Sequence, residues 1–483
     1  MYYLGNIKPN IVIFVSDDLG RYDIGYHGSR HLMTPNIDSL AADAVVLDRY
    51  YTQPLCSPSR GALLTGIHPI HSGTQHFVLM SGSPWGLPLK YKLLPQYLKD
   101  MGYNTQAIGK WHLGFFSKDY LPTSRGFDDH TGNWGGFEDY YNHWMKERGF
   151  QGLDFRHNLD VIRDSDGIYS TDYFTDKAIE LISDNNNTRP LFLYMAYQAM
   201  HSANSPFELQ APNELVKKFS FIKDEKRRLF AATLYSMDQS IGRIVEQLYY
   251  KNILNNTIIL FVSDNGGAIS GFMENYGSNY PLRGTKGTLW EGGVRVPAFI
   301  WSPLLKNSGY ISDSYIQVFD WLPTILEAID PKVYDQNRHK FDGISQWKTL
   351  NTKKCQNKNQ LLLNIDPIWN MSSIIINQWK LIQGSVPKDM SPESDLWSQS
   401  FDEDNDFKVD LQRNQSVVYK VLQQMNHPCE LNNVAKSFPQ IVTQLWQSIQ
   451  QYNRTAVPPL NKPIDSNANP IYHNNTWDVW YGD

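Results

Sequence analysis

The chain has 483 residues, of which 41% are hydrophobic, 19% charged and 13% aromatic. This composition is typical of a protein with a large buried core, and it excludes a wholly disordered chain, a collagen-like repeat and a coiled coil. The 44 basic residues stand against 49 acidic residues, and a net charge of −5 gives no sign of a nucleic-acid partner. The longest apolar runs are far too short to cross a bilayer, so we expect no membrane span.

Helix and strand signals alternate over the first 350 residues. Apolar, β-branched runs predict buried strands at 10–15, 103–108, 191–197, 257–263 and 297–301. Amphipathic patterns predict helices at 93–101, 173–182 and 223–250. Another helix is expected to begin at Pro35, with Thr34 as its N-cap and Asp38 in its first turn. The alternation predicts an α/β fold with a mostly parallel sheet between helices.

After about residue 350 the pattern changes to short strands separated by turns. These strands are expected at 361–365, 373–376, 379–383 and 417–422. An amphipathic helix follows at 439–452. We therefore expect a small antiparallel sheet with one helix, and two domains that cover residues 1–350 and 351–483.

Two of the predicted strands end in nearly the same sequence. Residues 11–20 read Ile-Val-Ile-Phe-Val-Ser-Asp-Asp-Leu-Gly, and residues 258–267 read Ile-Ile-Leu-Phe-Val-Ser-Asp-Asn-Gly-Gly. The segments between them do not match, so the similarity does not indicate a structural repeat. Oxygen ligands at strand ends suit a hard cation such as Ca²⁺ or Mg²⁺, although turn-forming residues at these places are the alternative interpretation. The candidate ligands are Asp17, Asp18, Asp264 and Asn265.

Cys56 is the first candidate functional residue outside the acidic turns. It precedes a predicted helix start at Pro58, and Arg60 follows within one turn. A helix N-terminus and a nearby cation lower the pKa of a thiol and attract anions. Cys56 is therefore either a reactive cysteine or part of an anion site, unless it is an ordinary buried cysteine.

Four further side chains follow predicted strands or lie in a Gly-rich loop. Lys110 and His112 come directly after the strand at 103–108, His201 follows the strand at 191–197, and Lys286 lies in the loop after the second acidic turn. Each of these residues alone is weak evidence for a functional site, because an exposed lysine or a packed histidine is common. Together with Arg60 they would place five potential cations around one metal, as the hydrolysis of an anionic ester requires.

A Gly-flanked aromatic cluster is the candidate rim of the substrate site, with a packed surface loop as the alternative. Its members are Trp134, Phe137, Tyr140, Tyr141 and Trp144.

Only three cysteines occur, which excludes a disulfide scaffold. Six glycosylation sequons favour the secretory pathway, with a lysosomal or extracellular destination. These sequons begin at Asn186, Asn255, Asn370, Asn414, Asn453 and Asn474. Residues 1–9 contain no signal peptide, so we expect that a leader has been removed from this numbering.

Residues 56–66 read Cys-Ser-Pro-Ser-Arg-Gly-Ala-Leu-Leu-Thr-Gly and resemble the signature of the sulfatase family, in which the cysteine is oxidised to formylglycine. Residues 102–114 are similar to the second signature of that family, and the similarity extends from Pro9 to about Pro458. Three stretches resemble the branch of arylsulfatase B (N-acetylgalactosamine-4-sulfatase) and of arylsulfatases I and J. They are 50–56, 281–293 and 320–324.

The resemblance implies an alkaline-phosphatase-like α/β fold with a small C-terminal antiparallel domain. It implies one Ca²⁺ ion, whose ligands would be Asp17, Asp18, Asp264, Asn265 and the modified Cys56. It further implies a sulfate pocket lined by Lys110, His112, His201 and Lys286, with Arg60 beside the formylglycine. The formylglycine-generating enzyme would be a partner during maturation.

The implied reaction splits a sulfate ester into an alcohol and sulfate through the hydrate of the aldehyde. Lys286 or His201 would protonate the leaving oxygen, and His112 would take the proton of the second hydroxyl. A sulfated sugar such as N-acetylgalactosamine 4-sulfate is the expected substrate.

Several alternatives remain open. A small aryl or glucosinolate-type sulfate is the alternative substrate, and an unconverted glycan-binding homologue is the alternative function. A phosphatase or phosphodiesterase is disfavoured, because no histidine adjoins the acidic turns in sequence. The family's vertebrate disulfides are missing, and only Cys355 and Cys429 remain to pair.

Overall fold

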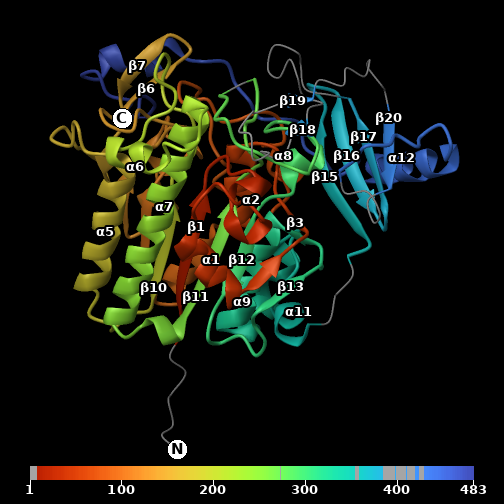
Figure 1. Cartoon of the computed structure of the whole chain (residues 1–483), viewed down its shortest axis with the longest axis horizontal. Helices are drawn as coiled ribbons and strands as arrows, with labels where there is room; N and C mark the ends of the chain where they lie inside the picture. Colours follow the sequence, from red (N-terminus) through yellow and green to blue (C-terminus); the bar gives the residue numbers. More distant parts are fainter. Residues whose placement is uncertain are drawn as a thin grey trace, which may run out of the picture.

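The computed structural model describes residues 8–271, 273–353, 358–384, 397–398, 409–410, 419–423 and 429–482. A ten-stranded sheet crosses its larger part in the order β13-β2-β12-β11-β1-β10-β4-β5-β8-β9 (Figure 1). Five neighbouring strands at its centre are parallel. They are β11 (Thr257–Ser263), β1 (Asn10–Ser16), β10 (Leu191–Ala196), β4 (Asn104–Gly109) and β5 (Asp129–Gly132).

Shorter strands extend this sheet on both sides. They are β12 (Ala298–Trp301), β2 (Val45–Leu47), β13 (Tyr310–Ser312), β8 (Arg156–His157) and β9 (Asp160–Val161). The strand β12 is antiparallel to both of its neighbours, and β8 is antiparallel to β5. The expected α/β class is confirmed, with a sheet that is mostly but not wholly parallel.

Helices cover both faces of the central sheet because its strands are apolar on both faces. In β1, Val12 and Phe14 pack with one group of helices, whereas Ile11, Ile13 and Val15 pack with the other. The first group is α1 (Pro35–Ala42), α5 (Ser170–Asp184) and α7 (Glu225–Tyr250). The second group is α2 (Cys56–Thr65), α4 (Leu94–Asp100), α9 (Trp321–Ile329) and α11 (Trp347–Thr352).

The start of α1 corrects one expectation. Thr34 occupies the N-cap position and Pro35 the first helical position, but the Thr34 side chain makes no capping hydrogen bond. Its hydroxyl instead accepts a hydrogen bond from the backbone N–H of Gly25 at 2.9 Å. The Asp38 carboxylate likewise accepts from the backbone N–H of Tyr26 at 2.8 Å. Both side chains therefore fix the loop before the helix.

A four-stranded antiparallel sheet lies beside the large sheet (Figure 1). Its strands are β15 (Gln360–Asp366), β16 (Met371–Ile376), β17 (Trp379–Gln383) and β20 (Tyr419–Gln423). One face packs on α12 (Pro439–Asn453), and the other packs against Tyr51, Leu289 and Val294 of the larger part. The expected antiparallel sheet with one helix is confirmed.

The division of the chain near residue 350 stays a prediction. The segment after α12 returns to the larger part, where the N–H of Val457 donates to the carbonyl of Ile70 at 2.8 Å. The N–H of Trp477 donates to the carbonyl of Leu153 at 3.0 Å. Cys355, one of the two cysteines that remain to pair, lies outside the described residues, so the structure does not test a disulfide with Cys429.

Several short elements complete the described structure. They are β3 (Tyr50–Tyr51), β6 (Trp144–Glu147), β7 (Phe150–Leu153), β14 (Ile316–Gln317), β18 (Trp397–Ser398), β19 (Val409–Asp410), α3 (Pro69–Ser72), α6 (Asn213–Lys218), α8 (Glu291–Val294) and α10 (Pro331–Asn337).

A buried ion cluster joins the small sheet to Glu291, the first residue of α8. The Lys380 ammonium of β17 lies 2.9 Å from a carboxylate oxygen of Glu291 and 2.9 Å from one of Glu430. All three side chains are inaccessible to solvent. Glu430 also accepts a hydrogen bond from the backbone N–H of Glu291 at 2.7 Å. Because Lys286 lies five residues before Glu291, this cluster helps to fix the loop that carries Lys286.

Replacing Lys380 by methionine should destabilise the fold. The substitution keeps the volume of the side chain but leaves the buried Glu430 carboxylate without its ion-pair partner and Glu291 with the more distant Arg295, at 3.5 Å. The loss of a partner from a buried ion pair costs about 3–5 kcal/mol. The midpoint of thermal unfolding should therefore fall well below that of the unmodified protein. Lys332→Met, on the exposed surface of α10, is the matched control and should leave the midpoint unchanged. Equal midpoints for the two variants would contradict this account.

Candidate active site

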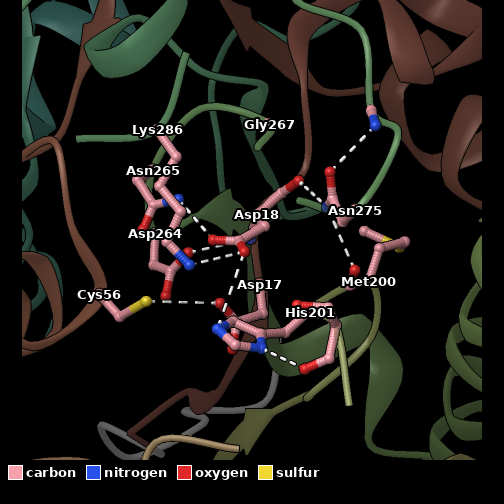
Figure 2. Close-up of polar contacts among 12 residues, drawn as sticks. Asp17, Asp18, Cys56, Met200, His201, Asp264, Asn265, Gly267, Asn275 and Lys286 are labelled. Atoms are coloured by element: carbon pink, nitrogen blue, oxygen red, sulfur yellow. Dashed lines mark hydrogen bonds and ion pairs between the residues drawn. The ribbon is translucent and has the colours of Figure 1, made fainter. Parts of the chain in front are cut away.

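The register of β1 and β11 brings the two acidic turns together. Each residue from Asn10 to Ser16 pairs with its counterpart from Thr257 to Ser263, so the matching sequences lie side by side. The next residues of both strands, at the carboxyl edge of the sheet, are Asp17, Asp18, Asp264 and Asn265 (Figure 2). The backbone N–H of Asp18 donates to Asp264 Oδ1 at 3.2 Å, and the Asn265 amide donates to Asp18 Oδ1 at 2.7 Å. All four side chains are buried.

Cys56 is the first residue of α2 and faces this group. Its Sγ lies 3.6 Å from Asp17 Oδ1, and only 1% of the residue is exposed. Burial raises the pKa of the Cys56 thiol far above its usual value, even though Lys110 and Lys286 oppose the shift. The expectation of a lowered thiol pKa is therefore wrong, because desolvation of the thiolate outweighs the nearby cations and the helix N-terminus.

Three buried cations neutralise the three carboxylates. The Arg60 guanidinium lies 2.8 Å from Asp264 Oδ2, and the Lys110 ammonium lies 2.6 Å from Asp17 Oδ2. Lys286 approaches Asp18 Oδ2 to 2.7 Å. Burial by itself would lower the pKa of Lys286, but Asp18 and the other anionic groups raise it above its usual value. Arg60 and Lys286, whose pKa values are both raised by the neighbouring carboxylates, therefore remain charged.

Two histidines complete the pocket, and their hydrogen bonds define their tautomers. His112 Nε2 lies 3.1 Å from the carbonyl of Leu79, so Nε2 carries the proton and Nδ1 the lone pair. His201 Nδ1 lies 2.7 Å from the carbonyl of Ser202, so its lone pair is on Nε2, which is 3.8 Å from Asp18 Oδ2. Burial and the positive charge of Lys110 and Lys286 lower the pKa of both histidines well below the usual value. Both rings are therefore neutral in this arrangement.

The oxygen atoms of this donor set suit a hard divalent cation, whereas the Cys56 thiol and the His201 imidazole do not. Asp17, Asp18, Cys56 and His201 each offer a ligand atom, and these four atoms lie within 4.8 Å of one another. Asn265 Oδ1 is buried and has no hydrogen-bond partner among the described residues. Carboxylate and amide oxygens are the ligands that Ca²⁺ prefers.

The structure brings every predicted site residue into one pocket. They are Asp17, Asp18, Cys56, Arg60, Lys110, His112, His201, Asp264, Asn265 and Lys286. Not all of the predicted aromatic rim is exposed, and its role at the substrate site stays a prediction. Trp134 and Tyr140 are buried in the core, whereas Phe137 stacks on the His201 ring at 5.6 Å and Trp144 is half-buried.

Two residues that help to hold the site together could not be predicted from the sequence. The Asn275 amide donates to the carbonyls of Asp18 at 2.9 Å and Met200 at 3.1 Å, and so holds together the segments that carry Asp18 and His201 (Figure 2). The backbone of Leu79 accepts from His112 and also donates to the Ser57 hydroxyl at 3.0 Å. Only the fold reveals these contacts, because both residues act through distant partners.

The fold and the site define a hydrolase of anionic esters, in which cations surround a buried side chain at a sheet edge. A family model described as Sulfatase matches residues 9–331. The chain is 36% identical to Arylsulfatase J of Mus musculus, over 99% of this chain and 81% of that protein. It is 32% identical to N-acetylgalactosamine-6-sulfatase of Homo sapiens, over 66% of this chain and 61% of that protein.

A solved structure of Ps i-CgsB in complex with k-i-k-neocarrahexaose superposes with a TM-score of 0.79. It is 28% identical and covers 97% of each chain. The chain belongs to the sulfatase family, has the alkaline-phosphatase-like fold of that family and is a sulfuric ester hydrolase. Within the part of the chain that the structure describes, no helix combines the length and the apolar character that crossing a membrane requires.

The buried thiol should be unreactive in the folded protein that keeps an unmodified Cys56. Because burial raises its pKa and restricts access, iodoacetamide should not modify Cys56 at neutral pH. The same thiol should react fully once the protein is unfolded in denaturant, which serves as the control. Peptide mass spectrometry measures alkylation in both states. Rapid alkylation of Cys56 in the folded protein would show that its thiol is not buried and protonated as described here.

Proposed function

We propose that this sulfatase uses a formylglycine made from Cys56 and one Ca²⁺ ion to hydrolyse the sulfate ester of a sugar. The observation that carries the proposal is the position of Cys56 Sγ, 3.6 Å from Asp17 in a pocket that also contains Arg60, Lys110 and Lys286. When formed, the hydrate of formylglycine supplies two hydroxyl groups on one carbon, one as the nucleophile and one for the release of sulfate. The formylglycine-generating enzyme is the partner that this proposal requires.

The calcium ion would be held by Asp17, Asp18, Asp264 and Asn265, with the modified residue 56 as a further ligand. When bound, it supplies positive charge that makes a nearby hydroxyl more acidic and attracts the sulfate group. Asn265 Oδ1 has no hydrogen-bond partner among the described residues. The oxygens of Asp17 and Asp18 that do not contact a lysine accept from neutral groups, the Cys56 thiol and the Asn265 amide. These atoms support the proposed ligand set.

The remaining residues would bind the sulfate group, position residue 56 and transfer protons. Lys110 and Lys286 would bind the sulfate oxygens, and Arg60 would hold residue 56 and Asp264 in position. His112 is suited to accept a proton at Nδ1, because its Nε2 proton is committed to the carbonyl of Leu79. Lys286 or His201 would protonate the leaving oxygen, which is the role that the resemblance to the sulfatase family implies for them.

A sulfated sugar is the preferred substrate class. N-acetylgalactosamine-6-sulfatase and the structure with k-i-k-neocarrahexaose are both sugar-related by name, and they resemble this chain over 66% and 97% of its length. N-acetylgalactosamine 4-sulfate remains the specific proposal. The similarity to Arylsulfatase J makes a small aryl or glucosinolate-type sulfate the second candidate.

Passage through the secretory pathway, to a lysosomal or extracellular destination, belongs to the same proposal. Five of the six sequon asparagines lie in the described part of the chain, and each of them is exposed, as glycosylation requires. They are Asn186, Asn255, Asn370, Asn453 and Asn474. Asn414 lies outside the described residues.

Protein made in cells with the formylglycine-generating enzyme should contain the aldehyde or its hydrate at residue 56. Mass spectrometry of the peptide measures the conversion. Cys56→Ser should abolish multiple turnover of 4-nitrophenyl sulfate, because serine offers one hydroxyl instead of two, while the thermal midpoint stays within a few degrees. An unmodified thiol in the expressed protein would favour the glycan-binding homologue, and sustained turnover by Cys56→Ser would refute the mechanism.

Removal of Ca²⁺ should abolish sulfatase activity and lower the thermal midpoint. A ligand that binds only the folded state stabilises it by about 2.7 kcal/mol at one hundred times its dissociation constant. Ca²⁺ added after chelation should therefore restore both activity and midpoint. Asp264→Asn should weaken this calcium response, whereas Asp335→Asn, on the exposed surface of α10, should not. If Ca²⁺ does not change the thermal midpoint of the unmodified protein, the proposed calcium site is wrong.

A further inference from the structure

One short segment of the chain contacts both histidines of the active site. This segment covers residues 133–140, directly after β5, and reads Asn-Trp-Gly-Gly-Phe-Glu-Asp-Tyr. His112 follows β4 and His201 follows β10, so the two histidines belong to different parts of the chain. A segment that contacts both of them therefore helps to determine how the two rings lie relative to each other.

The backbone of the 133–140 segment lies against the His112 ring. The N–H of His112 donates to the carbonyl of Trp134 at 3.1 Å. A Cβ atom added to Gly136 would lie 2.9 Å from both Cε1 and Nε2 of the His112 ring, which is closer than a real Cβ atom approaches its neighbours. Only glycine therefore lets the backbone approach the ring while Nε2 keeps its hydrogen bond to the carbonyl of Leu79.

Two side chains of the 133–140 segment hold His201. The Phe137 ring stacks on the imidazole ring, with centroids 5.6 Å apart and planes inclined by 17°. The Tyr140 hydroxyl donates to the backbone carbonyl of His201 at 2.9 Å. The ring itself makes its 2.7 Å hydrogen bond to the carbonyl of the adjacent residue, Ser202, which moves together with His201. The stacking on Phe137 therefore ties the ring to a different part of the fold.

The 133–140 segment is in turn held by two buried side chains. The Asp154 carboxylate accepts from the N–H of Trp134 at 3.0 Å and from the N–H of Gly135 at 2.7 Å. The Gln198 amide binds both backbone groups of Glu138, because it accepts from the N–H at 2.9 Å and donates to the carbonyl at 2.5 Å. Hydrogen bonds that are buried from water make the segment a fixed support for the two rings.

We propose that the 133–140 segment sets the positions of both histidines that transfer protons, with Phe137 as the positioning residue for His201 and Gly136 as that for His112. Neither residue has a side-chain group that binds a proton or a sulfate oxygen, so each acts through its histidine. The inference rests on the proposed function for the roles of the two histidines, and on the contacts of the segment for their positions.

Chemical modification of protein with unconverted Cys56 tests the stacking without any turnover. Diethyl pyrocarbonate acylates accessible neutral histidines, and His201 is only 4% exposed. Phe137→Ala should raise the rate of modification of His201 several-fold, as measured by peptide mass spectrometry. Phe207→Ala is the matched control, because Phe207 is 72% exposed on the segment after His201, and it should leave this rate unchanged. Equal protection of His201 in the two variants would overturn the proposal.

Kinetics on converted enzyme test the positioning of His201 during turnover. Phe137→Leu keeps an apolar side chain but removes the flat ring, and it should lower kcat for 4-nitrophenyl sulfate about tenfold or more, because a misplacement of about 1 Å can cost a hundredfold. KM should stay nearly constant, since Lys110 and Lys286 are unchanged. Phe137→Tyr keeps the flat ring and should retain most of the activity. A raised KM with an unchanged kcat would make Phe137 a substrate-binding residue and overturn the proposal.

Double substitutions identify the histidine through which each residue acts. Phe137→Leu should have no further effect on kcat in a His201→Gln background, but its full effect in a His112→Gln background. Gly136→Ala should show the opposite pattern. A purely structural role would instead lower the thermal midpoint and reduce kcat by the same factor in both backgrounds, and that result would refute the positioning roles.

The proposed function and this inference fail in different ways. If converted enzyme without substitutions hydrolyses no sulfate ester, the proposed function is wrong, and the modification of His201 still decides whether the 133–140 segment holds its ring. If 4-nitrophenyl sulfate is hydrolysed but Phe137→Leu leaves kcat unchanged, the proposed function stands and the positioning role fails.

Discussion

The in-register pairing of β1 and β11 is the constraint on which the site depends. It places Asp17 beside Asp264 in a region without solvent, where like charges repel strongly. The arrangement is stable only because Arg60, Lys110 and Lys286 reach the same point from three other segments. The pocket therefore forms as a unit with the fold, and the loss of Arg60 would leave the buried Asp264 carboxylate without its ion-pair partner.

Burial also determines the chemistry that the pocket can perform. It keeps the thiol of Cys56 protonated, and together with the lysines it keeps His112 and His201 neutral. A buried thiol of this kind is a poor nucleophile, which accords with a modified residue at position 56. Neutral histidines with defined tautomers are suited to exchange protons with a substrate, because each presents a lone pair whose position is fixed.

The charged cluster has an ion cluster on one side and a cavity on another. On the first side, the Lys380 cluster ties the small sheet to the loop that carries Lys286. On the other side, β6 and the segment after His201 form the cavity with Trp144 and Lys146. The residues that line this cavity are not among those of the buried charged cluster.

The sequence by itself determined the central strands, the small antiparallel sheet and the identity of the charged residues. These features are local: apolar runs define buried strands, and the near-identical ends of β1 and β11 mark two equivalent acidic turns. Tertiary structure decided the antiparallel direction of β12 and the raised pKa of Cys56, and it recruited Asn275 as a support. Strand direction, desolvation and long-range hydrogen bonds depend on residues far away in the chain, and no local pattern encodes them.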